Sequence, residues 1–144
     1  MFNFNVKQKT YKIGKYSIGG DPREAPTAVI GSIFYLKQKK IFKNEPEGDI
    51  NKDFAESLIR DQEELADKTG LIPGLDVILS YKTGIKPILD FVVETTDVPI
   101  ILDAPTYDVK MKALEYVDEA GIQDRIIYNS IVSESTDEEF EMLV

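Results

Sequence analysis

The sequence alternates short apolar runs with longer amphipathic stretches, and this alternation leaves few folds open to the chain. The apolar runs, which suit buried strands, cover residues 27–35, 75–81, 99–103 and 125–132. The stretches with helical spacing cover residues 51–69, about 85–94 and about 107–120, and a last one opens near residue 136. Strands that alternate with helices in this way are typical of a parallel sheet with helices packed against it.

Capping residues support the predicted helices. Asn51 can cap the first helix, and Gly70 can end it. In the second helix Pro87 falls in the expected first turn, where its missing N–H costs little. Thr136 and Glu139 have the spacing of a capping box, which predicts that a fourth helix begins there.

The first residues predict a separate β-hairpin. Phe2 and Phe4 alternate with polar neighbours, and Gly14-Lys15 can form a two-residue turn between two short strands. The expected organisation is therefore an N-terminal hairpin extension over residues 1–25, followed by strand–helix units over residues 26–144.

The number of strand–helix units predicts the architecture. A closed eight-unit barrel needs about 250 residues, and this chain of 144 residues supplies about four units. We expect an α/β fold of the TIM-barrel type, limited to the first half of the barrel. A small open α/β sheet, complete in itself, is the alternative. A half-barrel leaves edge strands and an interior open to water, so we expect completion by a C-terminal barrel half or self-association.

The composition excludes several chemistries. The chain has no Cys and no His, which excludes a disulfide framework, a thiolate nucleophile, a Ser–His triad and imidazole metal ligands. With 17 basic and 26 acidic residues the net charge is −9, which opposes binding to nucleic acid. No apolar stretch approaches the ~20 residues that cross a bilayer, and no signal peptide is evident. A cytoplasmic protein without a metal site is expected.

A long segment over residues 36–50 separates the first strand from its helix. In barrels and open α/β sheets alike, that side of the sheet holds the ligand. The segment contains the one basic run of the chain, from Lys37 to Lys43. A lid or docking arm and a plain exposed insertion are equally good interpretations.

Three polar residues interrupt the apolar strands: Asp76, Asp103 and Asn129. Each belongs to a different predicted strand, so in neighbouring strands the side chains can converge on one pocket. A buried carboxylate is costly unless it is hydrogen-bonded or paired, and a ligand rich in N–H donors would satisfy it. The amino-pyrimidine edge of a pterin is such a ligand.

Each of these residues also has a purely structural interpretation. Asp103 could cap the following helix together with Thr106, and Asn129 with Ser130 could satisfy backbone groups at the rim. Asp76 could pair with a buried Arg or Lys, and it could lie at mid-depth in the sheet, since apolar residues follow it.

At these residues the sequence resembles the H subunit of tetrahydromethanopterin S-methyltransferase, over the N-terminal half of that family. The resemblance runs through the whole chain in matching order and spacing. It is carried by GGDPREAPT at 19–27, GSIFY at 31–35, DQEELADKTG at 61–70, LD at 75–76 and 102–103, and DRIIYNSI at 124–131.

The resemblance implies a pterin-binding methyltransferase barrel. Such an enzyme moves a methyl group from a methyl-tetrahydropterin, either tetrahydromethanopterin or tetrahydrofolate, to the cobalt(I) of a corrinoid on a partner protein. In methanogens the partner belongs to a membrane complex, which implies a peripheral location. Asp76 and Asp103 correspond to strand-end acids that face the pterin, and Asn129 to an asparagine of the same site. No residue is assigned a catalytic role.

The resemblance leaves three functions open for this chain. In the first, it is half of a methyltransferase, inactive or nearly so alone because its pocket is open on one side. In the second, it is a non-catalytic binding or assembly subunit of a corrinoid methyltransferase complex. The third is a pterin-binding enzyme of another reaction type.

Overall fold

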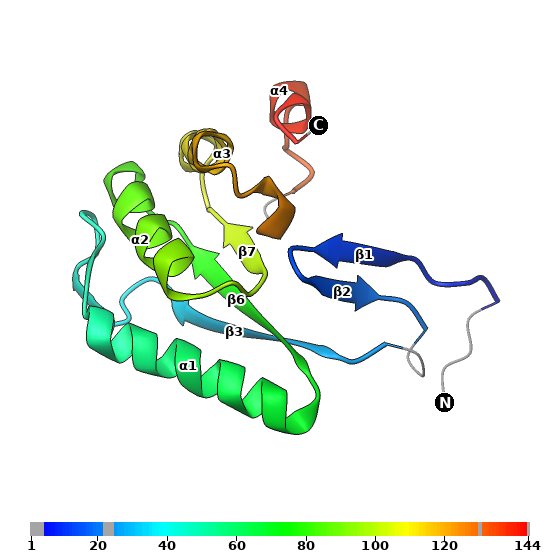
Figure 1. The fold of residues 1–144 in the computed structure, drawn as a ribbon. Helices are drawn as coiled ribbons and strands as arrows, with labels where there is room; N and C mark the ends of the chain where they lie inside the picture. Colours follow the sequence, from blue (N-terminus) through cyan, green and yellow to red (C-terminus); the bar gives the residue numbers. More distant parts are fainter. Residues whose placement is uncertain (1–4, 22–24, 130, 144) are drawn as a thin grey trace.

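A computed structural model of the chain describes residues 5–21, 25–129 and 131–143. Its centre is a four-stranded parallel sheet in the order β3-β6-β7-β8. Figure 1 shows the first three of these strands side by side. The strands are β3 (Ala28–Phe34), β6 (Ile72–Ile78), β7 (Ile100–Asp103) and β8 (Ile126–Tyr128). Neighbours in the sheet follow one another in the chain, as in a barrel, whereas a doubly wound sheet reverses its order at a switch point. The α/β prediction is confirmed.

A helix follows each strand of the parallel sheet before the next strand of that sheet begins. The helices are α1 (Lys52–Thr69), α2 (Lys82–Thr95), α3 (Tyr107–Ala120) and the short α4 (Asp137–Glu141), and a 3-10 turn, η1 (Gln123–Arg125), precedes β8. The core lies between the sheet and α1 to α3, and its fully buried side chains include Phe34, Leu75, Val77, Leu89, Ile100 and Leu102. Four strand–helix units are therefore present, as the alternation predicts.

The predicted hairpin forms from β1 (Thr10–Ile13) and β2 (Tyr16–Gly19). Ile13 pairs with Tyr16, which confirms the two-residue turn, and Gly14 adopts a φ of 55° there. The alternation at Phe2 and Phe4 lies outside the described residues. Residues 22–24 do as well, so a domain boundary at residue 25 stays a prediction.

The helix ends show which predictions depended on local signals. Asn51 caps α1 by accepting a hydrogen bond from the N–H of Phe54, and Gly70 ends the helix in the left-handed conformation. Thr136 caps α4 by accepting from the N–H of Glu139. These contacts confirm the predicted ends because each depends on residues within one turn.

The predicted second strand was misplaced. It was expected over residues 75–81, but β6 runs from Ile72 to Ile78. Its first residues pair with β3, and pairing with β7 starts only at Leu75. The N–H groups of Leu75 and Leu79 point toward β7. By alternation, an N–H at residue 73 would point to the same side, at a level where β7 has not yet begun. Proline lacks this N–H, so no hydrogen bond to β7 is lost at Pro73. Pro73 therefore fits inside this strand at little cost.

The start of the second helix was also misplaced, because α2 begins at Lys82 and not near residue 85. Pro87 consequently lies in the second turn. The added first turn packs on the long segment that precedes α1: a Cβ on Gly84 would lie 3.3 Å from the carbonyl oxygen of Glu45 and 3.3 Å from the nitrogen of Gly48. Periodicity alone does not reveal this contact. The last strand is likewise shorter than predicted, since β8 ends at Tyr128.

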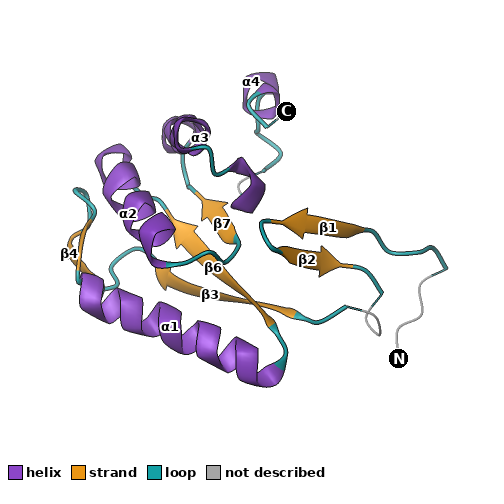
Figure 2. Ribbon diagram, viewed as in Figure 1, coloured by secondary structure: helices purple, strands orange, loops and turns teal. Residues whose placement is uncertain are grey.

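The long segment over residues 36–50 is a folded element. It contains two short antiparallel strands, β4 (Phe42–Asn44) and β5 (Asp49–Ile50), close to the start of α1 (Figure 2). Ile41 and Ile50 are buried in the main core. Across the described part of the chain, no helix combines the length and hydrophobicity that a bilayer crossing requires.

Candidate functional site

The sheet has one face toward the helices and one face away from them, here called the inner face. On β6, Leu75 and Val77 enter the core, so Asp76 between them lies on the inner face. On β7, Leu102 enters the core and Asp103 follows it on the inner face. Tyr128 packs against the core at the end of β8, and alternation places the next residue, Asn129, on the inner face.

Strand register brings the three predicted site residues to one region. Asp103 pairs with Ile78 at the carboxyl edge of the sheet. The N–H of Asn129 donates to the carbonyl oxygen of Leu102 at 2.9 Å, which places Asn129 beside Asp103. Asp76 lies two residues deeper, roughly 7 Å along the strand at the usual rise per residue. The structure therefore brings all three together, with Asp76 at mid-depth.

The carboxyl group of Asp76 is only partly satisfied by the protein. Its Oδ1 atom is buried and has no hydrogen-bond partner. Burial raises the pKa of this carboxyl, the Ser32 hydroxyl lowers it through a hydrogen bond, and the negative charge of Asp103 raises it again; the net pKa lies above the usual value. Asp76 therefore has an unused hydrogen-bond acceptor at Oδ1.

The purely structural interpretations of Asp76, Asp103 and Asn129 receive different degrees of support from the structure. Within the described residues, no Lys or Arg pairs with Asp76, so a buried ion pair does not explain it. Thr106 is the N-cap residue of α3, but its side chain makes no capping hydrogen bond. Asn129 is exposed, and the expected contribution of Ser130 lies outside the described residues.

Two residues of the inner face were missed from the sequence. Ser32 pairs with Asp76 across β3 and β6. Gly74 precedes Asp76 on the same face, and a Cβ there would lie 3.2 Å from Cδ1 of Ile101 and 3.5 Å from a side-chain carbon of Ile30. A glycine inside a strand marks such a close approach, but Gly74 lies outside the strand predicted over residues 75–81, so the sequence does not reveal it. Nothing in the sequence marks Ser32 as a site residue, because its position beside Asp76 depends on the strand register.

A buried polar cluster lies directly behind the site, on the helix side of β8. Lys110 of α3 and Glu139 of α4 are both buried, and Nζ of Lys110 lies 3.2 Å from Oε1 of Glu139. The Tyr128 hydroxyl donates to the same oxygen at 2.5 Å. Burial would raise the pKa of Glu139, but hydrogen bonds from Tyr128, Lys110 and Ser135 lower it overall. The cluster joins two helices to the strand end that precedes Asn129.

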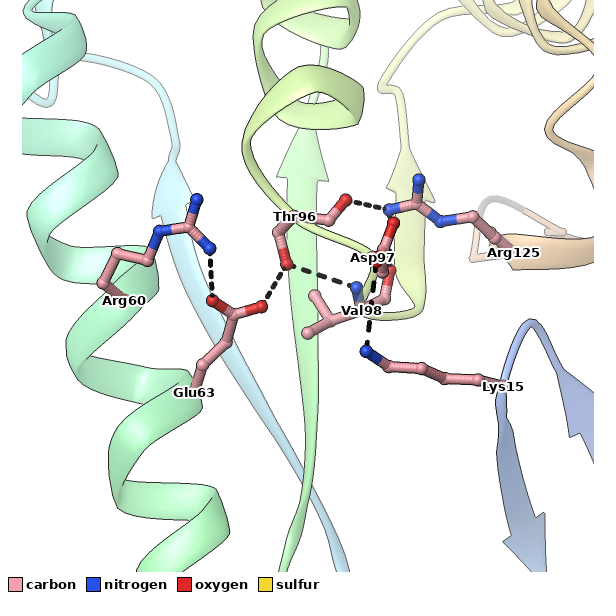
Figure 3. Close-up of polar contacts among 7 residues, drawn as sticks. All are labelled: Lys15, Arg60, Glu63, Thr96, Asp97, Val98 and Arg125. Atoms are coloured by element: carbon pink, nitrogen blue, oxygen red, sulfur yellow. Dashed lines mark hydrogen bonds and ion pairs between the residues drawn. The ribbon is translucent and has the colours of Figure 1, made fainter.

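The opposite edge of the sheet carries a second polar cluster, shown in Figure 3. Nη2 of Arg125 donates to the carbonyl oxygens of Thr96 at 2.5 Å and Val98 at 3.2 Å. The Thr96 hydroxyl donates to Oε1 of Glu63 at 2.6 Å. Lys15 of the hairpin turn lies 4.0 Å from the Asp97 carboxylate.

This amino-edge cluster holds the hairpin against the sheet, helped by a 2.7 Å hydrogen bond from the N–H of Gly14 to the carbonyl oxygen of Asp124. In barrels the amino edge serves stability and the carboxyl edge serves binding. The contacts at the two edges of this sheet fit that division.

Comparison with known proteins shows one family. The family model described as Tetrahydromethanopterin S-methyltransferase MtrH subunit matches residues 6–144. Three curated relatives are each named as the H subunit of tetrahydromethanopterin S-methyltransferase. The one from Methanopyrus kandleri is 38% identical over 99% of this chain and 44% of the relative. The one from Methanothermobacter marburgensis is 36% identical over 99% of this chain and 46% of the relative.

The relative from Methanocaldococcus jannaschii is 37% identical over the whole of this chain and 45% of its own length. The chain thus spans about half the length of the curated relatives it matches. That share agrees with a half-barrel of four strand–helix units.

Proposed function

Because the chain belongs to the family of tetrahydromethanopterin S-methyltransferase MtrH subunits, we propose that it forms the pterin-binding half of a methyltransferase barrel. In this proposal the methyl group passes from a methyl-tetrahydropterin to the cobalt(I) of a corrinoid on a partner protein. The pterin is tetrahydromethanopterin or tetrahydrofolate.

The unpartnered Oδ1 of Asp76 is the observation that carries the proposal. A buried oxygen without a partner costs free energy, and a ligand N–H removes that cost. The amino-pyrimidine edge of a pterin offers adjacent N–H groups, and the Asp103 carboxylate and Asn129 amide lie on the same inner face to receive the rest of the ring.

The protein's proposed part in methyl transfer is to bind and orient. The corrinoid supplies the nucleophile, so no protein nucleophile is required. Asp76 can accept a hydrogen bond from the pterin at its unpartnered Oδ1, and the carboxylate of Asp103 can accept another. A fixed ring presents the methyl group to the approaching corrinoid in one orientation, which lowers the entropic part of the barrier.

The lateral edges of the half-barrel supply the reason to expect a second half. A groove of about 490 Å³ runs between α1 and the outer edge of β3. It is lined mainly by apolar side chains, including Val29, Leu58, Leu65 and Leu71, and Leu65 is 61% exposed. We propose that a C-terminal barrel half covers this groove, and that the completed protein binds peripherally to a membrane-bound methyltransferase complex. Self-association of the chain is the competing way to cover it.

A non-catalytic binding or assembly subunit is the second candidate function. It is favoured by the open inner face, since Ser32 beside Asp76 is exposed in this chain. A half that never closes could still dock on a complex without enclosing a substrate. The two candidates differ in whether the assembled barrel turns over.

Methyl transfer to cob(I)alamin tests the proposal directly. The chain is produced alone and together with the C-terminal half of one of the relatives named above, and methylcobalamin formation is followed by absorbance. We expect turnover only in the assembled form, and loss of pterin binding in D76N but not in the control D67N, whose parent Asp67 is exposed on α1. Pterin binding without turnover would support the non-catalytic assembly role, and absence of binding by a folded assembly would reject both.

A further inference from the structure

Four lysines stand close together in the segment before α1: Lys37, Lys39, Lys40 and Lys43, here called the loop lysines. All four are exposed, and no acidic residue lies between Lys37 and Lys43, although Glu45, Glu47 and Asp49 follow in the same segment. In the described ranges none of the four forms an ion pair, although helix lysines such as Lys68 and Lys112 pair with a nearby glutamate. In a chain of net charge −9, this is a concentration of unpaired positive charge.

The backbone that carries the loop lysines is held in place. Ile41, in their midst, has no exposed surface. The N–H groups of Ile41 and Phe42 both donate to the carbonyl oxygen of Gln38, at 3.0 and 2.9 Å. The N–H of Lys37 donates to Oε2 of Glu45 at 3.2 Å. The backbone that carries the lysines is therefore fixed relative to the sheet, so binding an anion requires ordering of the side chains but not of the segment.

The loop lysines also lie on the correct side of the molecule. β3 ends at Phe34, on the carboxyl edge, and Ser32 of the same strand pairs with Asp76 of β6. Lys37 is five residues beyond Ser32, so their Cα atoms are at most about 18 Å apart. That span suits an elongated ligand with one end at Asp76 and the other end at the loop.

We propose that the loop lysines bind the anionic tail of the pterin substrate, meaning the carboxylate or phosphate groups at the end of its side chain. This inference rests on the proposed function and adds the residues that would hold the tail of the substrate. Electrostatics favours one orientation, since Asp76 and Asp103 repel an anionic group and the loop lysines attract it. The ring then enters the inner face first, and the tail stays at the rim.

Binding measurements on the assembled barrel test the inference. Three loop lysines are replaced in K39Q/K40Q/K43Q, and Lys37 is kept because its φ is 66°. The matched control K7Q/K9Q/K12Q changes the net charge equally, at three lysines of the N-terminal region. Tetrahydromethanopterin and a tetrahydropterin without acidic side-chain groups serve as probes, with Kd measured by calorimetry at two salt concentrations.

We expect the loop variant to raise the Kd of tetrahydromethanopterin about tenfold, because exposed ion pairs contribute modestly and add up over three lysines. Its Kd for the tail-less pterin should not change, and the control should leave both values unchanged. Added salt should weaken the wild type more than the loop variant.

Other outcomes overturn the inference. Equal Kd values for the loop variant and the wild type reject tail binding, while wild-type turnover would leave the proposed function intact. A higher KM for the corrinoid protein, with an unchanged pterin Kd, would assign the loop lysines to an acidic protein partner instead. If the wild-type assembly binds neither pterin, the proposed function and this inference both fail.

Discussion

Ser32 and Asp76 occupy paired positions on β3 and β6, and the Ser32 hydroxyl lowers the pKa of the Asp76 carboxyl that faces it. The pair links two neighbouring strands across the inner face. It also leaves one carboxylate oxygen of Asp76 without a partner. The first two predictions follow from this relationship.

Replacing Ser32 with alanine should raise the pKa of Asp76. The hydroxyl stabilises the ionised carboxylate, and its loss leaves burial and the charge of Asp103, which both favour the protonated form. NMR titration of the Asp76 carboxyl carbon measures the change. An unchanged or lower pKa in S32A would show that the hydroxyl does not stabilise the charge.

The variant D76N should be more stable than the wild type at neutral pH, by about 1 kcal/mol, because it removes a partly desolvated charge. The folded pKa of Asp76 lies above the ordinary value of 3.8, so the folded state binds more protons. The wild type therefore loses stability as pH rises from 3.8 through the folded pKa. Urea unfolding at several pH values should show the advantage of D76N shrinking toward acid pH. A constant difference would contradict this account.

Breaking the buried pair of Lys110 and Glu139 should be costly. E139Q leaves the buried ammonium of Lys110 without its countercharge and should destabilise the fold by about 3 kcal/mol. The double variant K110M/E139L removes both charges and should be closer to the wild type. The folded pKa of Glu139 is lowered, so its contribution is present at neutral pH and is lost as pH falls through that pKa. Denaturant unfolding distinguishes these cases, and equal stability of E139Q and wild type would refute the pair's role.

Replacing Arg125 should release the hairpin from the sheet. R125M removes the hydrogen bonds to the carbonyls of Thr96 and Val98, at a cost of about 2 kcal/mol. R125K should recover little, because an ammonium does not reproduce the guanidinium geometry. Hydrogen exchange at the N–H of Gly14, which is bonded to Asp124, reports the release. Unchanged protection in R125M would assign the hairpin's attachment to other contacts.

The accuracy of the sequence predictions depended on how local their causes are. The ends of α1 were correct because Asn51 and Gly70 act on the helix that they bound. The starts of β6 and α2 were wrong because Pro73 and Gly84 take their meaning from distant segments. Pro73 fits where β7 has not begun, and Gly84 packs against the segment before α1.

The same distinction applies to the site. Asp76 and Asp103 could be placed on one face because strand alternation predicts it once the strands are recognised. Ser32 could not be identified, since its role depends on the register of β3 against β6. Whether these residues bind a pterin stays a prediction that the experiments above decide.

The early start of β6 has a geometric consequence. β6 pairs with β3 from Ile72, but with β7 only from Leu75, so successive strands are offset along the sheet. In a cylinder such offsets add up to the shear that sets strand tilt and radius. A second half that closes the barrel must therefore match the strand tilt that these four strands already have. A half with a different offset could cover the apolar groove but would not complete the hydrogen bonding around the barrel.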